Sequence, residues 1–82
     1  MINFRGEERD ILLYSFRYSL PRMSYCTLTV SQIIINNWSE LSKHDRQLYQ
    51  REIKEAIDSK NIGMDCDKRN WERILQLRIN DD

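Results

Sequence analysis

The sequence predicts an all-α fold, a compact bundle of about four short helices, from three observations. The 82 residues can form only one core, because a chain of this size buries roughly 60–65% of its unfolded surface. Two glycines and one proline are too few for an all-β chain, which needs turns about every 8–12 residues. Apolar residues recur at helical spacing between capping signals. We expect a single domain over residues 1–82, with residues 1–5 and 80–82 flexible.

The first helix should begin at Gly6 or at the acidic residues that follow it, and it should end near Ser19. Acidic side chains in a first turn interact favourably with the helix dipole, and Pro21 cannot continue the helix. The apolar residues form two groups on opposite faces: Leu12, Leu13, Phe16 and Leu20 on one, and Ile11, Tyr14 and Tyr18 on the other. Two alternatives remain open: the helix is central and buried on both sides, or the tyrosine face is offered to a partner.

A loop over residues 22–28 should precede the second helix. Thr29 and Gln32 have the spacing of a capping box, and Leu28 and Ile33 stand at the positions of a hydrophobic staple. The β-branched run beyond them suggests a strand, but the cap and the helical spacing favour a helix. Its expected inward face consists of Val30, Ile33, Ile34, Trp38 and Leu41.

A second capping signal at Ser42 to Asp45 predicts a third helix that starts directly after Leu41. Its inward residues should be Tyr49, Ile53, Ala56, Ile57 and the stem of Lys60. It should end near Lys60, with Asn61 or Gly63 in the left-handed conformation.

The fourth helix should be capped by Asp65 or Asp67. With Asp67 as the cap, Cys66 and Trp71 occupy the staple positions. We expect the inward residues to be Trp71, Ile74, Leu75 and Leu77.

The 13 basic and 13 acidic residues balance, so no net field attracts nucleic acid or an anionic membrane. Residues 11–39 contain no acid, and Arg17 and Arg22 are their only charges, whereas the chain from Glu40 to the C-terminus alternates densely in sign. No apolar run approaches the roughly 18–20 residues that span a bilayer, and the first residues lack the plan of a signal peptide. We expect a cytosolic chain with no membrane partner.

The sequence offers little to catalysis or to metal binding. The single histidine, His44, is expected in an exposed first helical turn, the carboxylates follow the pattern of solvated helix faces, and the two glycines are isolated. Cys26 and Cys66 are far apart and lack a Cys-x-x-Cys motif, so they should be reduced, partly buried thiols. We expect no enzyme activity, no cofactor and no metal.

Nucleic-acid binding is one alternative function. The tight connection at Leu41 and Ser42 has the form of a helix-turn-helix with residues 42–60 as the reading helix. Basic and polar residues share one side of that segment: Lys43, Arg46, Gln50 and Lys54. Interleaved acids favour a solvated, salt-bridged face instead, because phosphate contacts require net positive charge.

A polar and aromatic region around Pro21 is the candidate partner-binding site, formed by Tyr14, Arg17, Tyr18, Arg22 and Tyr25. Tyrosine and arginine are enriched at interface hot spots, and an acid-free region matches the composition of interface cores. In a purely structural interpretation, the arginines bond carbonyls at helix ends and the tyrosines cover a thin core.

Residues 16–42 resemble small bacteriophage and prophage proteins that carry an aromatic-Arg-Tyr-x-Leu-x-Arg-Met-Ser/Thr-Tyr segment. A helix rich in Val and Ile that ends in Trp follows, and then a Leu-Ser helix start. The matching residues are Phe16, Arg17, Tyr18, Leu20, Arg22, Met23, Ser24, Tyr25, Trp38, Leu41 and Ser42. The resemblance implies a viral or prophage accessory protein in the host bacterial cytoplasm.

In that setting we expect the chain to bind a host or phage protein and to modulate or inhibit it by steric occlusion. Arg17 and Arg22 would pair with carboxylates or phosphate-mimicking groups of the target, while the tyrosines would supply rigid contact area. Two alternatives stay open: a small DNA- or RNA-binding regulator, and a homodimer that buries the tyrosine face of its first helix.

Overall fold

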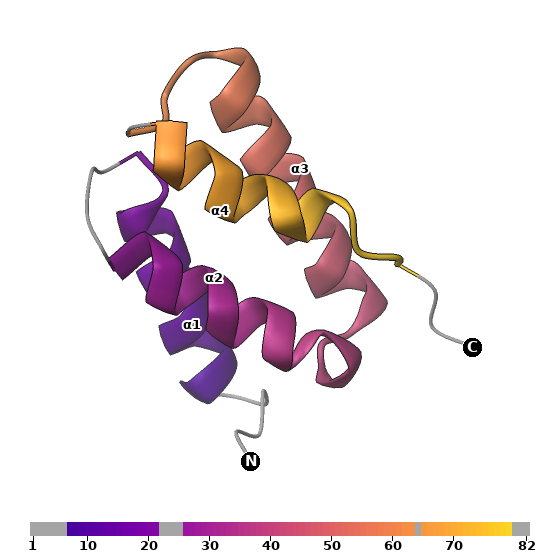
Figure 1. The fold of residues 1–82 in the computed structure, drawn as a ribbon. Helices are drawn as coiled ribbons and strands as arrows, with labels where there is room; N and C mark the ends of the chain where they lie inside the picture. Colours follow the sequence, from indigo (N-terminus) through magenta and orange to yellow (C-terminus); the bar gives the residue numbers. More distant parts are fainter. Residues whose placement is uncertain (1–6, 22–25, 64, 80–82) are drawn as a thin grey trace.

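The computed structural model describes residues 7–21, 26–63 and 65–79, and this part of the chain contains helices and no strand. The predicted all-α bundle of four short helices is therefore confirmed (Figure 1). The elements are α1 (Glu7–Ser19), α2 (Cys26–Asn36), the short 3₁₀ helix η1 (Trp38–Glu40), α3 (Lys43–Asp58) and α4 (Asp65–Leu75). Helix α2 packs on α1 and α4, and α4 also packs on α3. Within the described ranges, no helix has the length and apolar character needed to cross a membrane.

The core takes side chains from every α-helix. Phe16, Ile34, Ile53, Trp71 and Ile74 are completely buried. The Phe16 ring meets two aromatic neighbours edge to face, Tyr49 with ring centroids 4.8 Å apart and Trp71 at 5.4 Å. Such pairs contribute about 0.5–1.5 kcal/mol beyond the burial of their area. The helical spacing in the sequence thus identifies the residues around which the four helices pack.

The predicted start of the second helix is wrong by three residues. Helix α2 begins at Cys26, so the predicted cap Thr29 lies inside the helix, and the predicted staple residue Leu28 is exposed. The physical reason is a contact with α4. Thr27 is buried, and its hydroxyl donates a hydrogen bond to Asp67 Oδ1, which favours a helical backbone before the capping box.

Helix α2 also ends before the last two residues of its expected inward face. Asn37 donates to the carbonyl of Ile33 from both its backbone N–H and its side-chain Nδ2. Trp38 and Leu41 are buried as predicted, but Trp38 belongs to η1. Its indole Nε1 donates to the carbonyl of Arg78 at 2.7 Å, which holds the segment after α4 against η1.

The start of α3 confirms the predicted cap, because the Ser42 hydroxyl accepts a hydrogen bond from the backbone N–H of Asp45. The end differs from prediction. Lys60 is the residue in the left-handed region, with a φ of 60°, in place of Asn61. Asn61 N–H donates to Ala56 and Lys60 N–H to Ile57, which is the Schellman pattern. The exposed Lys60 therefore does not extend the inward stripe.

Both residues predicted to cap the fourth helix lie within α4. Asp67 is buried in its first turn, where it accepts the bond from Thr27. Cys66 is exposed, so the predicted staple with Trp71 and the predicted partial burial of this thiol are wrong. The side chain of Cys26 lies outside the described part of the structure.

Candidate docking face on α1

One side of α1 carries large side chains on the protein surface. Ile11, Tyr14 and Tyr18 are 63%, 72% and 55% exposed, although they are three and four residues apart, the spacing of a helical stripe. The rings of Tyr14 and Tyr18 stack with centroids 6.5 Å apart. Of the two alternatives in the sequence, the structure thus shows a helix buried on one side, with its tyrosine face on the surface.

A shallow groove of about 430 Å³ lies on the same side of α1. It is lined by Asp10, Leu13, Tyr14, Arg17 and Tyr18. The half-buried Leu13 gives it an apolar patch, the tyrosines are rigid, and Asp10 and Arg17 bring opposite charges two helical turns apart. An open groove of this composition suits side chains of another protein better than a small molecule, which binds in more enclosed cavities.

We call Asp10, Ile11, Tyr14, Arg17 and Tyr18 the α1 outer face. Three of them, Tyr14, Arg17 and Tyr18, were predicted as partner-binding residues. Asp10 and Ile11 join them because a helix returns to the same side after three or four residues and after seven. The other predicted site residues, Arg22 and Tyr25, lie outside the described residues.

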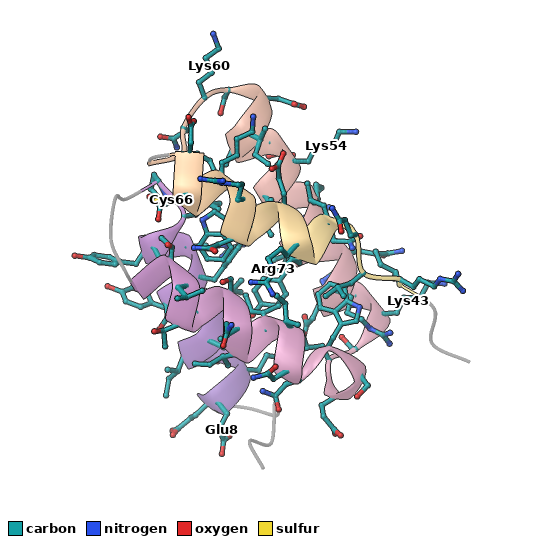
Figure 2. The ribbon with its side chains drawn as sticks, viewed as in Figure 1. Glu8, Lys43, Lys54, Lys60, Cys66 and Arg73 are labelled. Atoms are coloured by element: carbon teal, nitrogen blue, oxygen red, sulfur yellow. The ribbon has the colours of Figure 1, made fainter. Side chains whose placement is uncertain are left out.

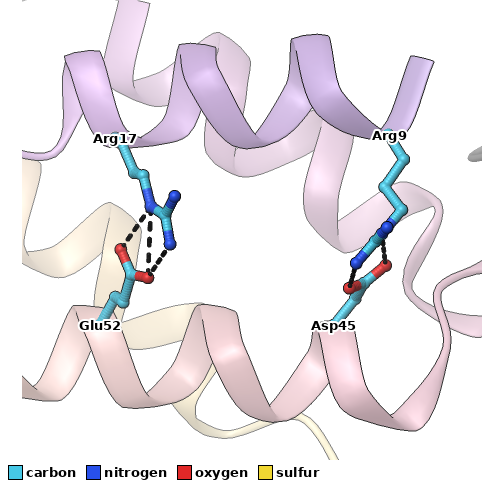
Figure 3. A network of polar contacts seen from close by, with 4 residues as sticks. All are labelled: Arg9, Arg17, Asp45 and Glu52. Atoms are coloured by element: carbon cyan, nitrogen blue, oxygen red, sulfur yellow. Dashed lines mark hydrogen bonds and ion pairs between the residues drawn. The ribbon is translucent and has the colours of Figure 1, made fainter. Parts of the chain in front are cut away.

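Arg17 has a carboxylate partner within the chain. Its Nε lies 3.0 Å from Glu52 Oε1 of α3, and its Nη2 lies 2.6 Å from Oε2 (Figure 3). The hydrogen bond to Glu52 raises the pKa of the Arg17 guanidinium above its usual value. The stretch that is free of acids in the sequence is therefore not free of them in space. Arg17 Nη1 has no hydrogen-bond partner among the described residues, and the side chain is 52% exposed.

A second ion pair joins the same two helices. Arg9 Nε donates to Asp45 Oδ2 at 2.7 Å and Nη2 donates to Oδ1 at 3.0 Å (Figure 3). This bidentate hydrogen bond raises the pKa of Arg9. Asp45 is buried, whereas Arg9 remains exposed.

The two ion pairs fix how α1 lies on α3. From the first pair to the second, the chain advances from Arg9 to Arg17 on α1 and from Asp45 to Glu52 on α3, so the helices run in the same direction. These advances correspond to about 12 Å and 10.5 Å of helix, and the edge-to-face contact of Phe16 with Tyr49 joins the same helices. The ion pairs and the aromatic contact together hold the outer face toward the exterior.

Sequence reasoning missed both ion pairs, although one signal pointed to them. Asp45, Tyr49 and Glu52 are four and three residues apart, and this spacing places both acids on the inward stripe of α3. Acids on an inward stripe need cationic partners, and α1 supplies two arginines.

The predicted nucleic-acid reading face is divided by the fold. Arg46 is buried, and Gln50 Nε2 donates to the carbonyl of Ile74 in the last turn of α4 and to that of Leu77 just after the helix. Lys43 and Lys54 project outward near opposite ends of α3 (Figure 2). Two of the four residues thus face the protein itself.

A larger open groove of about 690 Å³ lies between α3 and α4, where apolar residues meet charges of both signs. Its lining includes Gln50, Arg51, Lys54, Ile57, Glu72 and Leu75. Across residues 7–21, 26–63 and 65–79, no group of three or more His, Cys, Asp or Glu side chains is placed to hold a metal ion. His44 is exposed in the first turn of α3, as expected.

Comparison of the chain with protein-family models, with curated proteins and with solved structures gives no significant match.

Proposed function

We propose that this chain is a small protein-binding module that docks through the α1 outer face onto a larger host or phage protein and blocks it by steric occlusion. The observation that carries the proposal is the exposed row of Ile11, Tyr14 and Tyr18 beside a groove with one charge of each sign. An exposed apolar and aromatic patch on a small protein is typical of an interaction site. The sequence resemblance to phage accessory proteins supplies the setting.

Rigidity supports the proposal as well. A surface that is ordered before it binds loses less conformational entropy on association. Two ion pairs and the contact of Phe16 with Tyr49 hold α1 against α3, so the tyrosines are presented on an element with a fixed orientation. Tyrosine is well suited to this task, because it offers a large contact area with few rotatable bonds.

The experiment is capture from a nuclease-treated lysate of the host bacterium with a tagged chain, followed by mass spectrometry. A Tyr14→Ala/Tyr18→Ala variant should lose a protein that the wild type retains. Leu28→Ala is the matched control, because Leu28 is an exposed apolar residue of α2 outside the α1 outer face. The purified target should then bind the double variant at least tenfold more weakly, as expected when hot-spot tyrosines are removed.

The tyrosines are better targets than Arg17, since an alanine at Arg17 also breaks the ion pair with Glu52. Capture that is equal for wild type and the double variant would show that the target does not use this face. Retention of nucleic acid in place of protein, with affinity that falls steeply as salt is added, would favour the regulator alternative.

A further inference from the structure

The residues of the α1 outer face are arranged symmetrically about Tyr14. Asp10 and Arg17 are seven residues apart, and so are Ile11 and Tyr18. Seven residues are close to two helical turns, so each pair forms a row along the helix. One row is charged and the other is apolar, and Tyr14 lies between them, near the middle of both. In an antiparallel pair of such helices, each row can lie against the same row of the other copy with its two ends exchanged.

A two-fold axis perpendicular to α1 makes this face complementary to itself. The rotation reverses the direction of the second helix but keeps each row on its own side of the contact. Asp10 of each copy then lies opposite Arg17 of the other, and Ile11 lies opposite Tyr18. Tyr14 meets its equivalent on the axis.

We propose that the α1 outer face also binds a second copy of this chain, in an antiparallel, two-fold symmetric dimer with α1 against α1. This inference rests on the proposed function, because both use the α1 outer face as the docking surface. Here the occupant of that surface is a second copy of the chain. A parallel pair would exchange the two sides of the contact and place Asp10 against Ile11 and Arg17 against Tyr18, so pairing of the opposite charges selects the antiparallel arrangement.

The ionic groups of the outer face are available for this contact. Asp10 is exposed, and Arg17 uses Nε and Nη2 for Glu52 while Nη1 has no hydrogen-bond partner among the described residues. One guanidinium can therefore bind Glu52 within its own copy and Asp10 of the other copy, because its fork of donors can serve two carboxylates. The apolar row buries Ile11 and Tyr18 twice, once from each copy.

The size of the face sets the strength of the dimer. A helix of 13 residues is about 20 Å long, and one such helix offers less than the roughly 800 Å² per partner of a standard interface. We therefore expect a weak dimer that forms as the chain is concentrated. Because the dimer covers the face that docks the target, self-association and target binding exclude each other.

The test is sedimentation equilibrium of the full chain from micromolar to millimolar concentration, with two charge-reversal variants. Wild type should shift from monomer to dimer over this range. Asp10→Arg and Arg17→Asp should each dimerise at least tenfold more weakly, because each places like charges at both ends of the pair. An equimolar mixture of the two variants should recover association, since every altered charge then faces an opposite one.

Arg17→Asp also removes the partner of Glu52, so its helical signal and melting temperature are measured in parallel. Where this variant does not fold, Tyr14→Glu decides, because Tyr14 is exposed and its replacement places two carboxylates on the two-fold axis. A wild-type chain that stays monomeric at every concentration overturns the inference, and so does Tyr14→Glu that dimerises like wild type. A target that binds a purely monomeric chain through Tyr14 and Tyr18 would leave the proposed function standing without the dimer, and a dimer with no target would do the reverse.

Discussion

Replacement of Thr27 by valine removes one hydroxyl from the contact between α2 and α4 and keeps the size of the side chain. Thr27 is 0% exposed and Asp67 is 4% exposed, and Thr27 Oγ1 lies 2.6 Å from Asp67 Oδ1. Water cannot readily take the place of the lost donor in so buried a position. A hydrogen bond to a charged group contributes about 1.5–3 kcal/mol, so we expect the free energy of unfolding to fall by about 2 kcal/mol.

This loss is large for so small a domain. At about 0.05–0.15 kcal/mol per residue, a chain of 82 residues has a total stability of roughly 4–12 kcal/mol. A change of 1 kcal/mol shifts the melting temperature of such a domain by about 4–8 °C. The valine variant should therefore melt roughly 8–16 °C below wild type.

Urea denaturation, followed by circular dichroism and by the fluorescence of the buried Trp38 and Trp71, measures the effect. Thr29→Val is the matched control: Thr29 is exposed on the same helix, two residues further on, and the change should stay within about 0.5 kcal/mol of wild type. If the two variants lose equal stability, the hydroxyl of Thr27 does not stabilise the fold through Asp67, and the explanation for the early start of α2 fails.

Three further predictions follow from buried or bridging side chains. Burial, together with the nearby Asp45, raises the pKa of the Tyr49 hydroxyl. The stability that the neutral Tyr49 contributes is therefore complete below about pH 10 and is lost as the pH rises further. In urea denaturation at rising pH, the free energy of unfolding should fall less for Tyr49→Phe than for wild type. Asp45→Asn should lower the melting temperature more than Glu52→Gln, because Asp45 is buried. Salt at about 1 M should reduce the effect of Glu52→Gln more than that of Asp45→Asn. A larger loss for Glu52→Gln than for Asp45→Asn would contradict the structure. Gln50→Ala removes two hydrogen bonds, one to Ile74 of α4 and one to Leu77 just after it, and should lower the free energy of unfolding by about 1–3 kcal/mol in urea denaturation. Gln47→Ala, at an exposed position of the same helix, should have little effect. Equal losses would show that these bonds do not stabilise the C-terminal end of α4 and the segment after it.

The helices and the core could be predicted because their signals are local. A repeat of 3.6 residues identifies which side chains of a helix share a face, and this was sufficient for Phe16, Ile34, Ile53 and Trp71, all of which are buried. The cap at Ser42 is local too, since donor and acceptor are three residues apart.

The polar contacts between helices could not be predicted in the same way. Nothing in the sequence around Thr27 distinguishes it from a threonine of a loop or a helix start, because its partner Asp67 lies forty residues later in the chain. That contact changes the start of α2 and converts a predicted cap of α4 into a buried acceptor. Periodicity reports which face of a helix is inward, and it does not report which residue of another helix lies opposite.

In the candidate site, too, the local pattern could be predicted and the contact between helices could not. Exposure of the tyrosine face was one of two alternatives in the sequence, because the apolar pattern of α1 has two sides and the number of helices that cover it depends on packing. The partner of Arg17 was not foreseen, since Glu52 belongs to a segment whose dense alternation of charge reads as a solvated surface. In the structure this acid orients an arginine of the site.

Arg17 therefore has two roles that one substitution cannot separate, and a pair of backgrounds can separate them. In wild type, Arg17→Ala removes both the ion pair with Glu52 and any contact with a bound protein. In a Glu52→Gln background the charged pair is already weakened, so the additional effect of Arg17→Ala on target affinity reports mainly the direct contact. Equal losses in the two backgrounds would mean that Arg17 touches the target, because the effects of independent interactions add. A loss that vanishes in the Glu52→Gln background would mean that Arg17 acts by orienting α1, and Ile11, Tyr14 and Tyr18 would then carry the binding.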